Sequence, residues 1–187
     1  QDFPMSSRSP QMQPGSRIFR RFAENRKGNV AIQFALIAPL FFALIFAILE
    51  TALVFVAGQV LETALHDNAR LVLTSQTTAA NKTQAQFQTD VCNKTSALFD
   101  CNKIVVEAKK YPNFGSVNLA KTIDSCTPTQ STSFSIGTNG EVMAIRAFYQ
   151  WPLYVTGLGY YIGGNNTDGS KCNKRLLSST AIFRIEP

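Results

Sequence analysis

The stretch that decides the fold is VAIQFALIAPLFFALIFAIL, which runs from Val30 to Leu49 and contains no charged residue. Thirteen of its twenty residues are Val, Ile, Leu or Phe. Twenty helical residues span about 30 Å, which is the thickness of the hydrocarbon core of a bilayer. The stretch therefore predicts a membrane-crossing helix. Pro39 lies inside it, and membrane helices tolerate proline better than soluble helices do.

Two other interpretations of this stretch fit less well. A cleaved secretory signal has a shorter apolar region, of about 7–15 residues, followed by small residues at the cleavage site. Here the nearest candidate exit, Phe55-Val56-Ala57, has Phe where a small residue is needed. A buried helix of a soluble protein would need apolar cover on every face, which a chain of 187 residues can hardly supply. We favour an anchor that is uncleaved or processed unconventionally.

The residues before the apolar stretch are basic and predict its orientation. Residues 1–27 contain six Lys or Arg against Asp2 and Glu24. Positive charge beside a first span stays in the cytoplasm, so we expect a single-pass inner-membrane protein whose C-terminal domain is periplasmic or extracellular. This tail holds most of the net charge of +6. The high pI therefore comes mainly from the charges that orient the membrane helix. No basic patch interleaved with aromatic residues follows, so no nucleic-acid partner is expected.

The rest of the chain predicts an α+β fold. Past Glu50 the helical pattern continues with an apolar stripe, so one helix is expected from about Asn29 to Leu73. A second short helix is expected over 85–98. The residues that follow are richer in β-branched and aromatic side chains. They predict a small antiparallel sheet with strands at 103–108, 133–136, 141–149 and 179–185. The stripe is Leu61, Leu65, Ala69 and Val72.

Two connections stand out among these elements. Thr138-Asn139-Gly140 predicts a hairpin turn between the strands at 133–136 and 141–149. Residues 157–169 are rich in Gly, Asn and Tyr and predict a long exposed loop. The expected organisation is a partly disordered basic cytoplasmic tail (1–27), a transmembrane helix (28–55), an exported helical region (56–100) and a disulfide-braced β-rich domain (101–187).

All four cysteines lie on the predicted exported side, which favours disulfides formed in an oxidising compartment. A zinc site would need closer pairs such as C-x-x-C, which are absent. Three pairings are possible, and the one preferred here joins Cys92 to Cys101 and Cys126 to Cys172, because the first pair closes a short loop.

No catalytic constellation appears in the sequence. His66 is the single histidine, and neither H-E-x-x-H nor G-x-S-x-G occurs. The glycines between Gly157 and Gly164 lack the spacing of a dinucleotide fingerprint. We therefore expect no enzyme activity, no cofactor and no small-molecule substrate. Four aromatic residues lie near these glycines: Trp151, Tyr154, Tyr160 and Tyr161. They form either a partner-binding patch or part of the core, and core packing is favoured for Trp151.

The segment RKGNVAIQFALIAP (Arg26–Pro39), followed by an apolar run to Glu50, resembles the start of TadE-like proteins. These TadE/TadG pseudopilins belong to the Tad (Flp) pilus system, a branch of the type IV pili. The family pattern has Gly after a basic stretch, then an aromatic, a Pro within the helix and a Glu near its far end. Here these positions are Gly28, Phe34, Pro39 and Glu50. The resemblance covers about residues 17–75 well and the remainder loosely.

The resemblance implies cleavage by a membrane peptidase between Gly28 and Asn29. It also implies roles in helix packing and assembly for Gln33, Phe34, Pro39 and Glu50. Where the family has Glu, this chain has Gln33, which supplies only a neutral hydrogen bond to a neighbour's new N-terminus. Glu50 either pairs with a cation of a neighbouring subunit or marks the end of the lipid-facing surface.

The function expected from the resemblance is that of a non-enzymatic minor pilin-like subunit of a Tad-type pilus assembly or secretion apparatus. Its expected partners are the membrane and other pilin or pilus-assembly proteins. Adhesion to a surface is one of the roles considered for the exported domain. The alternative is a single-pass anchored periplasmic domain that binds a ligand or an envelope partner and never joins a filament.

Overall fold

The structure is a computed structural model that describes residues 28–74, 82–120, 126, 132–155, 161–165 and 169–186. The predicted tail at 1–27 lies outside these residues. Two compact units meet within one helix, the first ending at Ile45 and the second beginning at Phe46, and each is considered by itself.

The predicted long helix is present as a single element, α2 (Asn29–Leu73). In the second unit, one face of α2 is buried at a spacing of three or four residues, which is the pattern of a helix packed on a core. The buried residues include the whole predicted stripe: Ala57, Leu61, Ala64, Leu65, Asn68, Ala69 and Val72. The helix end is closed by the C-terminal segment, whose Glu186 N–H donates to the carbonyl of Leu73 at 3.2 Å.

The second predicted helix is α3 (Gln84–Thr95). It begins with a capping box in which Thr83 and Gln86 each accept a hydrogen bond from the other's backbone N–H, so two otherwise unpaired donors of the first turn are satisfied. A short 3-10 turn, η3 (Cys101–Lys103), follows and leads into the sheet.

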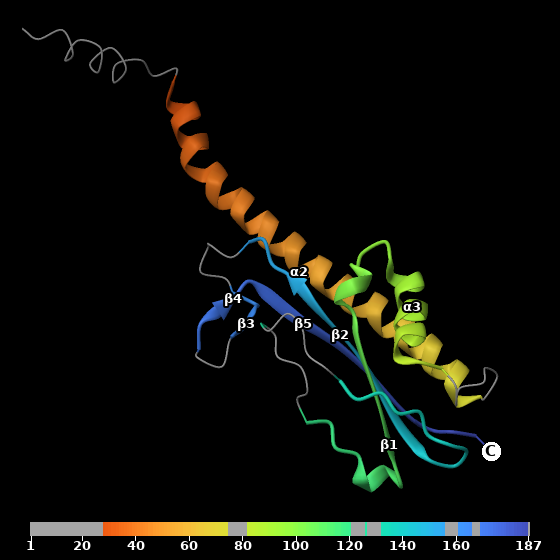
Figure 1. Ribbon diagram of the computed structural model, residues 1–187. Helices are drawn as coiled ribbons and strands as arrows, with labels where there is room; N and C mark the ends of the chain where they lie inside the picture. The colour runs from red at the N-terminus through yellow and green to blue at the C-terminus, as the bar shows by residue number, and fades with distance from the viewer. Residues whose placement is uncertain are drawn as a thin grey trace, which may run out of the picture. The chain divides into compact units, whose positions relative to one another are not determined.

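The sheet is antiparallel with the order β1 (Val105–Tyr111), β2 (Val142–Pro152) and β5 (Lys174–Arg184). Together with α2 it confirms the α+β prediction. Helices α2 and α3 cover one face of it (Figure 1), where β2 contributes Met143, Ile145 and Ala147 to a core shared with Leu61 and Phe87. Because β2 lies in the centre, its residues from Val142 to Tyr149 are all buried.

The predicted hairpin between 133–136 and 141–149 is wrong. The turn itself is present, with the Glu141 N–H donating to Thr138 at 3.0 Å and Gly140 in the left-handed region at φ 87°. However, Phe134 forms a parallel bridge with Ala108 of β1. Both edges of β2 are occupied by β1 and β5, so the incoming segment pairs at the free edge of β1.

The predicted loop at 157–169 is described only in part. Within it lies β3 (Gly164–Asn165), which pairs with β4 (Lys171–Cys172) in a separate two-stranded sheet. A glycine is required beside this pair, because a Cβ on Gly163 would lie 2.9 Å from the Cys172 carbonyl oxygen.

Candidate functional site

The apolar half of α2 has the surface of a membrane span. Its large side chains from Val30 through Leu49, including Phe34, are exposed, except for the half-buried Ile45. In the described part of the chain, α2 is the helix long and apolar enough to cross a bilayer. Pro39 lies inside it without ending it, and Gln33 is exposed.

Gly28 directly precedes α2, which begins at Asn29. Gly28 is exposed, and a Cβ built on it meets no described atom within 4 Å. Local packing therefore does not require glycine at this position.

Glu50 is the residue that ties α2 to the end of the sheet. Its side chain is only 6% exposed. One carboxylate oxygen accepts hydrogen bonds from the backbone N–H groups of Tyr154 and Val155, and the Val155 N–H lies 3.1 and 3.2 Å from the two oxygens. Strand β2 ends at Pro152, so the strand ladder supplies no acceptor to these two amides, and Glu50 does so instead.

The contact changes the interpretation of Glu50. Its carboxylate binds the chain's own backbone, and exposed apolar side chains continue past it at Leu53, Phe55 and Val56. The first exposed polar residue beyond them is Gln59. Glu50 therefore does not mark the end of the apolar surface, which extends about two turns further along α2.

Replacing Glu50 with Leu should leave the amides of Tyr154 and Val155 without an acceptor. An unsatisfied buried donor costs about 1–3 kcal/mol, so we expect a loss of that size in the free energy of unfolding. Both amides should exchange with solvent faster, measured by hydrogen exchange of the full chain in detergent micelles. Glu50→Gln keeps a carbonyl acceptor and should lose less; equal exchange in both variants and the unaltered chain would contradict this role.

The predicted aromatic patch is divided by the structure. Trp151 packs edge-on against Phe99, with ring centroids 5.8 Å apart, and also contacts Tyr149. The Tyr161 hydroxyl donates to a backbone carbonyl of the β3–β4 sheet, that of Cys172 being 2.6 Å away. Tyr154 is 81% exposed, and Tyr160 lies outside the described residues.

Two disulfides brace the second unit. Cys92 of α3 is bonded to Cys101 of η3, and Cys126 is bonded to Cys172 of β4. This is the pairing that the short loop favoured. The first bridge fixes α3 to the start of the sheet, and the second closes a loop of 46 residues.

A buried ion pair on the opposite face of the sheet was missed by the sequence analysis. Glu107 of β1 and Arg146 of β2 are register partners and are 1% and 6% exposed. The Arg146 Nε donates to Glu107 at 2.7 Å, and Lys109 Nζ lies 2.8 Å from the other carboxylate oxygen. The guanidinium also donates to the carbonyl of Ala120 at 3.1 Å. The available signal was Arg146 within the mostly apolar β2, together with Glu107 beside two valines in β1.

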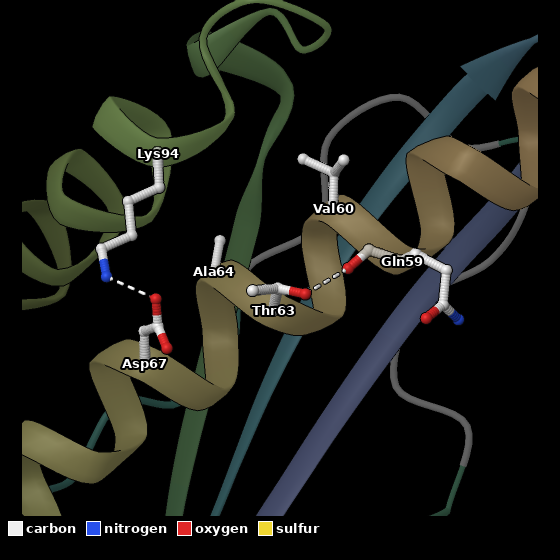
Figure 2. A pocket seen from close by; sticks show the side chains of 6 residues that line it. All are labelled: Gln59, Val60, Thr63, Ala64, Asp67 and Lys94. Carbon is white, nitrogen blue, oxygen red and sulfur yellow. Dashed lines mark hydrogen bonds and ion pairs between the residues drawn. The ribbon is translucent and has the colours of Figure 1, made fainter.

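A shallow groove of about 340 Å³ lies between α2 and α3 (Figure 2). An ion pair crosses it, with Lys94 Nζ 2.7 Å from the Asp67 carboxylate. Gln59 and Thr63 line the α2 side. The groove holds no nucleophile paired with a base. No cluster of metal-ligating side chains occurs among the described residues.

The Asp67–Lys94 pair predicts a small pH dependence. The hydrogen bond from Lys94, and then its charge, lower the pKa of Asp67 below its usual 3.8. A lowered pKa adds stability that is complete above the unfolded-state pKa and is lost as the pH falls through the folded-state value. Asp67→Asn should therefore reduce the loss of stability below about pH 4, measured as urea midpoint against pH. Glu62→Gln, on the same helix, should retain that loss.

The apolar helix, its Gly–Asn start and the buried Glu50 are thus combined in one continuous segment. Residues 28–70 match the family of TadE-like proteins. The TadE-like segment therefore contains the apolar span, Glu50 and most of the buried stripe. No curated protein and no solved structure is similar enough to the chain to count as a match.

Proposed function

We propose that this chain is a non-enzymatic, pilin-like minor subunit of a Tad-type pilus assembly or secretion apparatus, anchored in the inner membrane. The observation that carries the proposal is the TadE-like segment at residues 28–70. In this segment one helix supplies both an exposed apolar span and the buried side of a folded domain. A subunit of an envelope-spanning assembly needs both parts.

The proposed orientation places the basic tail in the cytoplasm and the sheet domain in the periplasm or outside the cell. The charge of residues 1–27 supports this side for the tail. The two disulfides support an oxidising compartment for the domain. We propose the boundaries given above for the tail, the span, the helical region and the β-rich domain.

Processing between Gly28 and Asn29 is part of the proposal. Gly28 is exposed and has no packing role, so the glycine would serve recognition by a peptidase. Cleavage would place a new N-terminal amine four residues before Gln33. The side-chain amide oxygen of Gln33 is an uncharged acceptor. It can accept a hydrogen bond from that amine or from the amine of a neighbouring subunit, where a Glu carboxylate would form an ion pair.

The decisive measurement is the N-terminal sequence of the protein isolated from membranes. We expect it to begin at Asn29, and Gln33→Glu to increase recovery in crosslinked complexes with pilus-assembly proteins. An intact basic tail with no such crosslinks would refute the proposal. That result would favour the second candidate, an anchored periplasmic binding domain. The second candidate is kept because Gln33 stands where the family pattern has Glu.

A further inference from the structure

The exposed apolar surface of α2 is longer than a bilayer core. It runs from Val30 to Val56 and passes Glu50 because the Glu50 carboxylate faces the end of the sheet. Twenty-seven helical residues extend about 40 Å, whereas the hydrocarbon core is about 30 Å thick. About 10 Å of apolar helix surface therefore remains for the headgroup region. This excess belongs to the second compact unit, at Leu53, Phe55 and Val56.

Tyr154 lies beside α2 at the level of Glu50. Its backbone N–H donates to Glu50, which fixes the residue beside the helix about one turn before Leu53. Its side chain is one of the most exposed aromatic groups in the described residues. A phenol combines an apolar ring with a polar hydroxyl, and tyrosines are enriched where hydrocarbon meets headgroups.

We infer that Leu53, Phe55, Val56 and Tyr154 form a lipid-binding end of the exported domain, embedded in the headgroup region of the bilayer's outer side. The inference rests on the proposed membrane anchoring and adds the domain itself as a second point of attachment. Glu50 makes this possible, because a carboxylate facing lipid would be costly unless it were hydrogen-bonded. Its partners are backbone amides of the same domain.

The chain supplies a matched control at the other end of the sheet. Tyr111 pairs with Val142 at the start of β2, whereas Tyr154 follows the end of β2 at Pro152. Phe114, three residues after Tyr111, is 58% exposed. It is therefore an exposed aromatic residue separated from Tyr154 by the length of an eleven-residue strand.

The test places the single tryptophan of the full chain at either position. Trp151→Phe/Tyr154→Trp and Trp151→Phe/Phe114→Trp are reconstituted in vesicles of phosphatidylcholine and phosphatidylglycerol. Quenching by lipids brominated near the headgroup is then measured. We expect quenching at least about twofold stronger at position 154 than at position 114. Equally weak quenching at both positions, in chains that resist alkaline extraction, would overturn the inference and would point to a protein partner for Tyr154.

Failure of the proposed anchoring gives a different result, since the chain would then be recovered in the alkaline supernatant. Trp151 packs against Phe99 and Tyr149, so its replacement is checked by near-ultraviolet circular dichroism. If Trp151→Phe does not fold, the comparison is made with Trp151 retained. The excess quenching of Tyr154→Trp over the unaltered chain should then exceed that of Phe114→Trp.

Discussion

Replacing Arg146 with Met should lower the free energy of unfolding by about 3 kcal/mol, since removing one partner of a buried ion pair leaves the other charge uncompensated. Glu107 is 1% exposed and would retain Lys109 as a cation in contact. That remaining contact keeps the expected loss at the lower end of the usual range of about 3–5 kcal/mol. The measurement is urea unfolding of the full chain in detergent micelles, followed by Trp151 fluorescence.

The control removes both charges. Glu107→Leu with Arg146→Met removes both buried charges and leaves Lys109, whose side chain is 37% exposed, to be solvated by water. Replacing a buried ion pair by apolar residues is often close to neutral. The double variant should therefore be more stable than Arg146→Met alone. If it is less stable than the single variant, the pair stabilises the fold by its own attraction, and our account of the cost is wrong.

Removing the Cys126–Cys172 bridge should lower the free energy of unfolding by about 4 kcal/mol. A disulfide lowers the conformational entropy of the unfolded chain, and this effect grows with the logarithm of the number of residues in the closed loop. This loop spans 46 residues. The double replacement of Cys126 and Cys172 by Ala is compared with the unaltered chain under the same unfolding conditions, with no reductant present.

The other bridge provides the matched comparison. Cys92 and Cys101 are nine residues apart, so replacing both by Ala should cost about 2.6 kcal/mol on the same relation. The order of the two losses is the test. A larger loss at Cys92 and Cys101 would mean that the bridge from α3 to η3 acts mainly through contacts in the folded state.

Local patterns in the sequence predicted much of this fold. The long helix followed from the uncharged run and the stripe at Leu61 and Leu65, because helical periodicity is set by residues three or four apart. The strands at β2 and β5 followed from their β-branched and aromatic residues. The resemblance to TadE-like proteins depended on the same local segment, and residues 28–70 match that family.

The features that the sequence did not predict depend on distant residues. A turn joins the segment at 133–136 to β2, which predicted that the two would pair. However, the edges of β2 are occupied by β1 and by β5, which comes from the C-terminal end of the chain. Glu50 meets amides 104 and 105 residues away. Glu107 and Arg146 are visible in the sequence as charged residues within predicted strands, but the register of β1 and β2 is what brings them together.

The continuous helix α2 has a consequence for biosynthesis. Leu61 and Leu65 leave the ribosome about a hundred residues before β5, although both pack into the core to which Ala181 of β5 belongs. At about 5–20 residues per second, this delay lasts about 5–20 s. The stripe is therefore without its final cover for several seconds after its synthesis. Under the proposed orientation, it is the segment of the nascent domain where a periplasmic holdase chaperone should bind.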